Sequence, residues 1–400
     1  MVAPSVFRPH KHHIVTQLAN RMQHIGPFHV MSLLEQAKQM EAQGQSVIHM
    51  EIGEPDFPTP DTIIQAGIRA LQNGLTRYTA SKGLPELRQA IADYYAQRYQ
   101  VSIDASRVIV TPGASGALQL ALSALIGRDD EVLLADPTYP CNRHLVSLAE
   151  GKPVPIPTGP ETGFQPSAAQ IAAHWTTRTK AVMLATPANP TGSTVPRQSM
   201  QAIADVVAQR KGTLIVDEIY QGLVYEGEDY SALAVSDDCL VINSFSKFFQ
   251  MTGWRLGWLI APPELVAPIE RIAMNAFLAA PTIAQYAALA AFQSDTLQLL
   301  DKRRETLRQR RDYLLQALTG MGFKIPVTPQ GAFYIYADCS AVCDDSWQFA
   351  QNLLSSQQLA VTPGLDFGSN QPHRFIRFAY TAEIPVLEQA MHRLGQFLQR

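Results

Sequence analysis

Short runs of aliphatic residues recur through the middle of the chain, and segments with helical spacing separate them. Segments 117–125 and 197–209 have this helical spacing. Continuous aliphatic and β-branched runs between helices are typical of strands that helices cover on both faces. The pattern therefore predicts an α/β fold with a mainly parallel sheet, whose strands we place at 107–111, 131–135, 181–185, 213–216 and 240–243.

The pattern changes toward both ends of the chain. A long segment rich in arginine and leucine, 294–316, predicts a helix that connects the sheet to a C-terminal α+β region. We expect the N-terminal stretch to pack with that C-terminal region. The predicted division is an N-terminal arm (1–26), a smaller α+β domain built from both chain ends (27–59 plus 295–400) and a large α/β/α domain (60–294).

The composition is that of a globular enzyme. Of the 400 residues, 46% are hydrophobic and 17% are charged, which is too apolar for a disordered chain and enough for a large core. Lysine and arginine total 32 against 35 for aspartate and glutamate, so the net charge is −3. This balance argues against a nucleic-acid partner and against a polybasic membrane anchor.

Cysteine usage and apolar stretches bear on metal content and location. The four cysteines form no CxxC pair, which disfavours structural zinc, and so few cysteines fit a reducing compartment. Residues 1–15 contain no apolar signal-peptide core, and polar residues interrupt the most apolar stretch, 276–292. We expect a cytoplasmic protein with no metal and no membrane span. His10, His12 and His13 can bind a metal, but we interpret them as part of a mobile arm.

The residues that carry chemistry follow the predicted strands, at the sheet edge where ligands bind in α/β folds. Lys247 follows the strand at 240–243. A lysine in this place is usually a surface residue, but a desolvated lysine attacks carbonyl groups to form a Schiff base. Arg255, nearby serines and the Gly113–Gly116 turn that opens a helix suit a phosphate monoester. The chain has no GxGxxG or GxxxxGKS/T motif, which disfavours dinucleotides and nucleoside triphosphates.

A second set of polar residues suits a flat aromatic cofactor. Asp217 ends a predicted strand, and a buried carboxylate there needs a cation, which a pyridinium nitrogen supplies. Tyr220 and Asn189 can hydrogen-bond a phenolate oxygen, although an Asn-Pro-x-Gly pattern is also that of a plain turn. Tyr139 can stack on the ring, although most such tyrosines only pack. With the lysine and the phosphate-binding groups, these residues describe a site for pyridoxal 5′-phosphate (PLP).

Four motifs in a fixed order carry a resemblance to a known family. They are Asn189-Pro190-x-Gly192, Asp217-x-x-Tyr220, Ser244-x-Ser246-Lys247 and Arg255. With them, the chain resembles the fold-type I PLP-dependent aminotransferases of class I/II, in particular their bacterial aspartate-aminotransferase-like branch. The resemblance runs from the motif that begins at Gly53 to the C-terminus, which is most of the chain.

The resemblance implies a role for each matching residue. Lys247 forms the imine with the cofactor and moves the proton at the substrate α-carbon, and Asp217 keeps the pyridine nitrogen protonated. Tyr220 and Asn189 hydrogen-bond the phenolic oxygen, and Tyr139 stacks on the ring. The other cofactor-binding residues surround the phosphate: Gly113, Ala114, Ser115, Ser244, Ser246 and Arg255.

The resemblance also implies a partner and a substrate site. Tyr78 matches a tyrosine that the family extends across a dimer interface to the partner's phosphate, which implies a homodimer. Arg377 matches the arginine that grips the substrate α-carboxylate, Asn189 belongs to the same site, and Gly53 lets substrate approach the backbone. Arg374 is the rival of Arg377. On a strand the two point to opposite faces, so only one can serve, and the family spacing favours Arg377.

Two departures from the family pattern bear on the substrate. Aspartate-preferring relatives in this branch often have a basic residue after the glycine turn, where this chain has Ser115. Segment 275–281, where other relatives carry a cross-subunit arginine, is apolar. A buried, unpaired substrate carboxylate would cost several kcal/mol. We therefore expect a neutral, hydrophobic or aromatic donor, with residues 28–31 either lining its pocket or belonging to the core.

The predicted activity is transfer of an α-amino group from an amino acid to a 2-oxo acid by ping-pong kinetics. A PLP-dependent C–S or β-lyase, or a synthase, is the alternative, because the same motifs serve these reactions. A non-catalytic, PLP-binding regulatory protein with a DNA-binding domain is a weaker alternative. The short stretch before Gly53 and the net charge of −3 argue against it.

Overall fold

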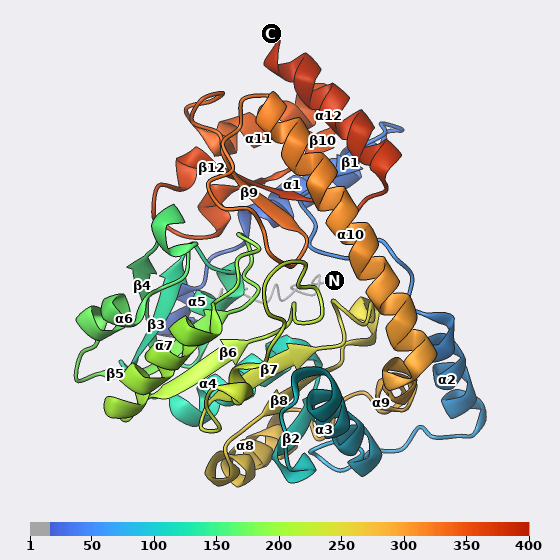
Figure 1. Cartoon of the computed structure of the whole chain (residues 1–400), viewed down its shortest axis with the longest axis vertical. Helices are drawn as coiled ribbons and strands as arrows, with labels where there is room; N and C mark the ends of the chain where they lie inside the picture. The colour runs from blue at the N-terminus through green and yellow to red at the C-terminus, as the bar shows by residue number, and fades with distance from the viewer. Residues whose placement is uncertain (1–16, 400) are drawn as a thin grey trace, which may run out of the picture.

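A seven-stranded sheet forms the centre of the protein in the computed structural model, which describes residues 17–399 (Figure 1). The strand order is β2-β8-β7-β6-β5-β3-β4. Strand β8 runs antiparallel to β2 and β7, and the other neighbouring pairs are parallel. The strands are β2 (Val108–Thr111), β3 (Glu131–Asp136), β4 (Lys152–Pro157), β5 (Thr179–Ala185), β6 (Thr213–Asp217), β7 (Leu240–Ser244) and β8 (Gly257–Ile260).

Both faces of this sheet are apolar because successive strand residues enter two different cores. Val132 and Leu134 of β3 pack with helices on one face, whereas Leu133 packs in the core on the other face. The first core holds residues of α4 (Gly113–Leu125), α5 (Pro140–Leu148) and α8 (Pro263–Ala276). The second core holds residues of α3 (Pro85–Tyr99), α6 (Ala168–His174) and α7 (Arg197–Gln209).

The mainly parallel α/β sheet and its five predicted strands are confirmed, with ends that differ by a residue or two at most positions. Helix α7 has the predicted bounds, whereas α4 begins four residues before the predicted helix, at Gly113. Strands β4 and β8 were not predicted. Strand β4 has three prolines and lies at the sheet edge, where missing amide donors are tolerated.

Smaller sheets form from the two ends of the chain. Strands β11 (Thr362–Pro363), β12 (Phe375–Ala379) and β9 (Tyr334–Asp338) form an antiparallel sheet in that order. Strand β1 (Ile48–His49) pairs in parallel with β10 (Leu359–Ala360). The N-terminal stretch thus lies against the C-terminal region, although the domain boundaries themselves stay a prediction. Helices α1 (His29–Ala42), α11 (Ser346–Gln357) and α12 (Ile384–Leu398) complete this part.

A long helix, α10 (Ser294–Gly320), connects the two parts of the chain (Figure 1). It has the predicted start and continues four residues beyond the predicted end. The apolar stretch before it forms α9 (Thr282–Ala288) and a following 3-10 helix, with most of its alanines buried in the core against α2 (Asp61–Gln72). Within residues 17–399, no helix is long and apolar enough to cross a bilayer.

Two sequence-based expectations concern residues that the structure does not describe. The cluster of His10, His12 and His13 lies outside the described part, as does most of the predicted arm. Among residues 17–399, no group of three or more histidine, cysteine or acidic side chains is placed to hold a metal ion.

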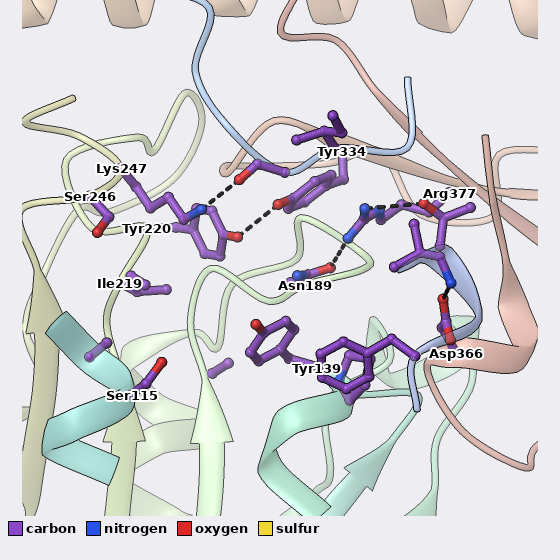
Figure 2. A pocket seen from close by; sticks show the side chains of 18 of the residues that line it. Ser115, Tyr139, Asn189, Ile219, Tyr220, Ser246, Lys247, Tyr334, Asp366 and Arg377 are labelled. Atoms are coloured by element: carbon purple, nitrogen blue, oxygen red, sulfur yellow. Dashed lines mark hydrogen bonds between the residues drawn. The ribbon is translucent and has the colours of Figure 1, made fainter. Parts of the chain in front are cut away.

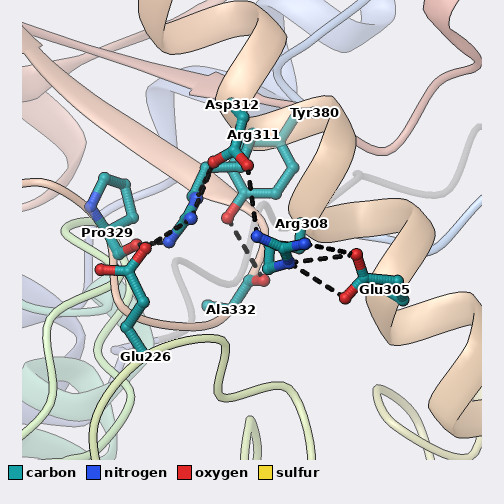
Figure 3. Close-up of polar contacts among 8 residues, drawn as sticks. All are labelled: Glu226, Glu305, Arg308, Arg311, Asp312, Pro329, Ala332 and Tyr380. Atoms are coloured by element: carbon teal, nitrogen blue, oxygen red, sulfur yellow. Dashed lines mark hydrogen bonds and ion pairs between the residues drawn. The ribbon is translucent and has the colours of Figure 1, made fainter.

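Arg311 fixes α10 against the loop that leads into β9 (Figure 3). Although the residue is only 2% exposed, its guanidinium donates to Pro329 O at 2.8 Å and to Glu226 Oε1 at 2.6 Å. The Tyr380 hydroxyl donates to Ala332 O at 3.4 Å in the same cluster. These bonds provide donors for the carbonyl groups of Pro329 and Ala332, so they help to hold the loop before β9 in place.

We expect Arg311→Met to lower the free energy of unfolding by about 2–3 kcal/mol, because charge-assisted hydrogen bonds at a buried carbonyl are lost. Thermal unfolding followed by circular dichroism measures the change. Arg308→Met is the matched control, since Arg308 lies on the same helix and pairs with Glu305, but its side chain is 41% exposed. Equal melting temperatures of the two variants would contradict the assignment.

Candidate active site

A cavity of about 330 Å³ opens between the carboxyl ends of the central strands and the three-stranded sheet (Figure 2). Ala185, Asp217 and Ser244 end β5, β6 and β7 and line it from one side. Tyr334 of β9 and Arg377 of β12 line it from the other. The cavity therefore lies at the edge where ligands bind in open α/β sheets.

The structure brings nearly all sequence-predicted site residues to this cavity. Gly113 does not line the cavity itself but adjoins two residues that do. It precedes Ala114, and a Cβ atom on it would come 2.8 Å from Arg255 Nη2. Tyr78 does not line the cavity of its own subunit and is 82% exposed. The other predicted residues all line it: Gly53, Ala114, Ser115, Tyr139, Asn189, Asp217, Tyr220, Ser244, Ser246, Lys247, Arg255 and Arg377.

One end of the cavity is built to receive an anion. Helix α4 starts at Gly113, whose φ of +75° places it in the left-handed region that glycine adopts without cost. The unpaired amides and the positive end of the helix dipole lie at this start. The Ser244 and Ser246 hydroxyls are 2.9 Å apart beside it, and the Arg255 guanidinium approaches the same turn. A phosphate group fits this combination.

Lys247 and Asp217 lie in the cavity with shifted acidities. Lys247 Nζ donates to Gly53 O at 2.5 Å. Burial lowers the pKa of Lys247 to about 8, because the charged ammonium loses water. Burial also raises the pKa of Asp217 to about 6, against the opposing effects of the Ile219 amide and of Lys247. An amine that loses its proton readily thus lies near a carboxylate whose ionised form a further cation would stabilise.

A chain of polar contacts crosses the cavity (Figure 2). The Tyr220 and Tyr334 hydroxyls are 2.8 Å apart, and the Arg377 guanidinium lies 4.2 Å from the centre of the Tyr334 ring. Arg377 Nη1 donates to Asn189 Oδ1 at 2.8 Å, and Nη2 donates to Glu51 O at 2.5 Å. Arg377 Nε is buried and has no acceptor within the described residues, so this arginine retains a donor for a bound carboxylate.

The two arginines near β12 differ sharply. Arg377 is 5% exposed and lines the cavity. Arg374 ends a 3-10 helix (Pro372–Arg374) before the strand and pairs with Asp338 at 2.5 Å, with its side chain 39% exposed. Of these two arginines, only Arg377 is thus available to a ligand in the cavity.

Tyr334 and Asp366 are among the lining residues that sequence reasoning missed. Tyr334 has no role in the sequence analysis, yet its hydroxyl lies so close to Gly53 that a Cβ atom there would collide with it. The close approach at Gly53 is therefore to this tyrosine. Asp366 lines the cavity near Arg377 (Figure 2) and had no signal beyond its acidic side chain. Both depend on contacts between distant parts of the chain.

The remaining wall of the cavity is apolar. Phe28, Val30 and Met31 line it, with Leu34 one turn further along α1. Of the two interpretations of segment 28–31, the structure supports a place in the pocket for these three residues. The apolar segment 275–281 does not contribute to the cavity of its own subunit.

PLP fits the residues present. The cavity offers an amine at Lys247, an anion site where a side chain on Gly113 would collide with Arg255, and a buried carboxylate at Asp217. These are the groups that an aldehyde, a phosphate and a protonated pyridine nitrogen require. Tyr220 and Tyr139 line the same cavity.

Comparison with known proteins identifies the family. The sequence profile of "Aminotransferase class I and II" matches residues 45–394. The chain is 35% identical over 376 residues to the valine–pyruvate aminotransferase of Mycobacterium tuberculosis, covering 94% of this chain and 97% of the relative. It is 34% identical over 386 residues to the aspartate/prephenate aminotransferase of Thermus thermophilus, covering 96% and 99%.

A solved structure gives the same result for the fold. A crystal structure of an aminotransferase from Mycobacterium tuberculosis superposes with a TM-score of 0.93 at 34% identity, covering 96% of this chain and 99% of that chain. The family membership supports aminotransferase activity over the lyase, synthase and regulatory alternatives. The chain therefore belongs to the class I and II aminotransferases, PLP-dependent fold-type I enzymes, and lies in their aspartate-aminotransferase-like branch.

Proposed function

We propose that this aminotransferase takes its amino group from a neutral amino acid with a hydrophobic or aromatic side chain and transfers it to a 2-oxo acid by ping-pong kinetics. One observation carries the proposal. Among residues 17–399 of one subunit, the basic residues that line the cavity are Lys247, Arg255 and Arg377, and each has a role in holding the cofactor or the substrate α-carboxylate. None of these three residues is left to pair with a carboxylate on the substrate side chain. Burying such a carboxylate without a partner costs several kcal/mol.

The residues of the chain have distinct roles in this proposal. Bound PLP supplies the electron sink that makes the substrate α-proton acidic. Arg377 and Asn189 hold the substrate carboxylate and so orient the α C–H bond, and Lys247 Nζ moves the proton at that carbon. Asp217 keeps a proton on the pyridine nitrogen, and Tyr220 hydrogen-bonds the phenolic oxygen.

In this proposal the cofactor is held at its phosphate group and at its ring. Ser244, Ser246 and Arg255 bind the phosphate together with the amides at the start of α4, which comprise Gly113, Ala114 and Ser115. Tyr139 stacks on the ring. The contacts described above support each of these assignments, since the residues converge on one cavity.

The relatives support a neutral donor as one of several specificities in the family. One relative is named for valine and pyruvate, whereas another is named for aspartate and prephenate. Family membership therefore leaves the donor open, and the lining of the cavity supports a neutral one. At Ser115 the chain lacks a basic side chain that could meet aspartate, and Phe28, Val30 and Met31 line the cavity with apolar surface.

The working unit in this proposal is a homodimer. The exposed Tyr78 follows Arg77, whose carbonyl accepts from Thr282 Oγ1 at 2.9 Å, and the exposed Leu278 comes four residues before Thr282. Met274 is also exposed nearby in sequence, at the end of α8. Exposed apolar residues in one region fit an interface with a second copy. The four free cysteines suit the reducing cytoplasm.

The donor is tested by adding single amino acids, without a 2-oxo acid, to the PLP-loaded protein and following the visible absorbance. We expect leucine, phenylalanine or alanine to convert the cofactor to its pyridoxamine form. Aspartate should have a specificity constant at least about tenfold lower, equivalent to about 1.4 kcal/mol. An aspartate constant above those of all three would refute the proposed donor, and release of ammonia or sulfide would indicate a lyase.

A substitution at Ser115 makes this test sharper. Ser115→Lys places a cation at the cavity, so the specificity constant should rise for aspartate and fall for leucine. Ser123→Lys is the control, because Ser123 lies exposed on the same helix. It should leave both constants unchanged. A rise for aspartate in both variants would mean that the effect comes from net charge alone.

The acidity of Lys247 predicts a pH dependence. With a pKa lowered to about 8, the neutral amine predominates above that pH and the ammonium below it. The rate at which cofactor-free protein takes up PLP should rise about tenfold per pH unit below 8 and level off above it. Stopped-flow absorbance measures this rate. Pyridoxamine 5′-phosphate lacks the aldehyde, so its uptake should lack this dependence. A midpoint near the ordinary lysine pKa would contradict the assignment.

The homodimer is tested by sedimentation equilibrium, which should give twice the chain mass of 44.0 kDa. Tyr78→Phe should keep this mass but weaken PLP binding about two- to tenfold, because one hydrogen bond to the partner's phosphate is lost. Tyr313→Phe, a tyrosine on α10 that does not line the cavity, controls for the loss of a hydroxyl. A fully active monomer would refute the homodimer.

A further inference from the structure

We propose that Asp366 is a specificity-determining residue, because its carboxylate holds the start of α1 against the cavity and so positions the apolar wall that meets the donor side chain. The inference rests on the proposed function and deepens it. The ligand class that this wall selects is amino acids with a bulky apolar side chain. Asp366 acts through α1 and is thus a positioning residue.

Asp366 caps a helix that lies 337 positions earlier in the chain. Its Oδ1 accepts from His29 N at 2.7 Å, and its Oδ2 accepts from Val30 N at 2.7 Å. The residue before α1, Phe28, provides no side-chain cap. Asp366 therefore satisfies two of the unpaired amides at this helix start and places a negative charge at the positive end of its dipole.

The carboxylate is held firmly by its surroundings. Asp366 is 2% exposed and ends a 3-10 helix (Gly364–Asp366). Its carbonyl oxygen accepts from Arg143 Nη2 of α5 at 2.6 Å, and the next carbonyl, of Phe367, accepts from Thr138 N at 2.8 Å.

The same loop also reaches the central sheet. Ser369 donates through its amide and its hydroxyl to Asp136 Oδ2, at 2.9 and 2.8 Å. Asp136 ends β3. The loop is thus fixed to the carboxyl end of the sheet, so Asp366 transmits that position to α1.

The held segment carries the apolar wall. Phe28, Val30, Met31 and Leu34 line the cavity and fall within the first turns of α1 or directly before them. Met31 is 53% exposed, and Phe28 and Val30 are only partly buried. Part of this apolar surface is left uncovered by the described residues, and a bulky apolar substrate side chain would remove it from water. The methyl group of alanine extends far less toward such a wall.

The test compares donors in PLP-loaded protein. For Asp366→Ala, we expect the specificity constants of leucine and phenylalanine to fall about five- to thirtyfold, as loss of a helix cap suggests. The constant for alanine should change less than about twofold on the same scale. Asp366→Asn keeps one carbonyl oxygen as an acceptor and should give an intermediate loss, so the result does not depend on one variant folding well.

Asp104→Ala is the matched control. Asp104 also caps a helical turn, since its carboxylate accepts from Ser106 N at 2.8 Å, but it does not line the cavity. This variant should leave all donor constants unchanged. Equal losses for alanine and leucine in Asp366→Ala would overturn the inference, because they would indicate direct contact with the amino or carboxylate group or a general loss of structure. Unchanged constants would overturn it too.

Hydrogen exchange provides a readout that is independent of activity. The amides of His29 and Val30 should exchange at least about tenfold faster in Asp366→Ala than in the unsubstituted protein, whereas α12 should be unaffected. Unchanged exchange at these amides would overturn the inference that Asp366 holds the start of α1. A preference for aspartate in the unsubstituted enzyme would instead refute the proposed donor class, and it would do so whatever the exchange result.

Discussion

The cost of keeping ionisable groups away from water at the end of an apolar sheet dominates this structure. The central sheet is apolar on both faces, so the groups that follow its strands are enclosed by hydrophobic layers. Lys247 and Asp217 stand at this edge, and burial shifts their pKa values to about 8 and about 6, in opposite directions. The protein thus holds a readily neutral amine and a carboxylate that favours a cationic neighbour before any ligand arrives.

The contacts of Tyr334 and Arg377 connect this edge to the second part of the chain. Tyr334 contacts Tyr220 through its hydroxyl and Arg377 through its ring. A group bound to the central strands and a carboxylate bound to Arg377 therefore share one rigid frame. Such a frame reduces the freedom that a substrate loses on reaching its reactive geometry. Arg311 helps to hold Tyr334 in position, because it fixes the loop before β9.

Much of the fold and the site could be predicted because their signals are local. The buried parallel strands have continuous apolar runs, and the polar motifs directly follow them. Three prolines interrupt β4, and β8 begins with a glycine and has a single β-branched residue, so neither strand shows the β-branched run that marks the others. The contacts of Tyr334 and Asp366 join residues 114 and 337 positions apart, and no local spacing encodes such approaches. The apolar segment at 28–31 could not be assigned to pocket or core until its tertiary position was known.

The walls of the cavity come from separate stretches of chain, and this separation has an evolutionary consequence. The groups proposed to do chemistry lie on strands or in the loops directly after them, whereas the apolar wall belongs to the first turns of one helix near the N-terminus. Mutations at positions 28, 30, 31 and 34 can therefore change the shape of the wall while leaving the reactive groups in place. A gene duplicate could acquire a new amino donor by drift in a seven-residue window, and a combinatorial library restricted to these four codons would sample that route.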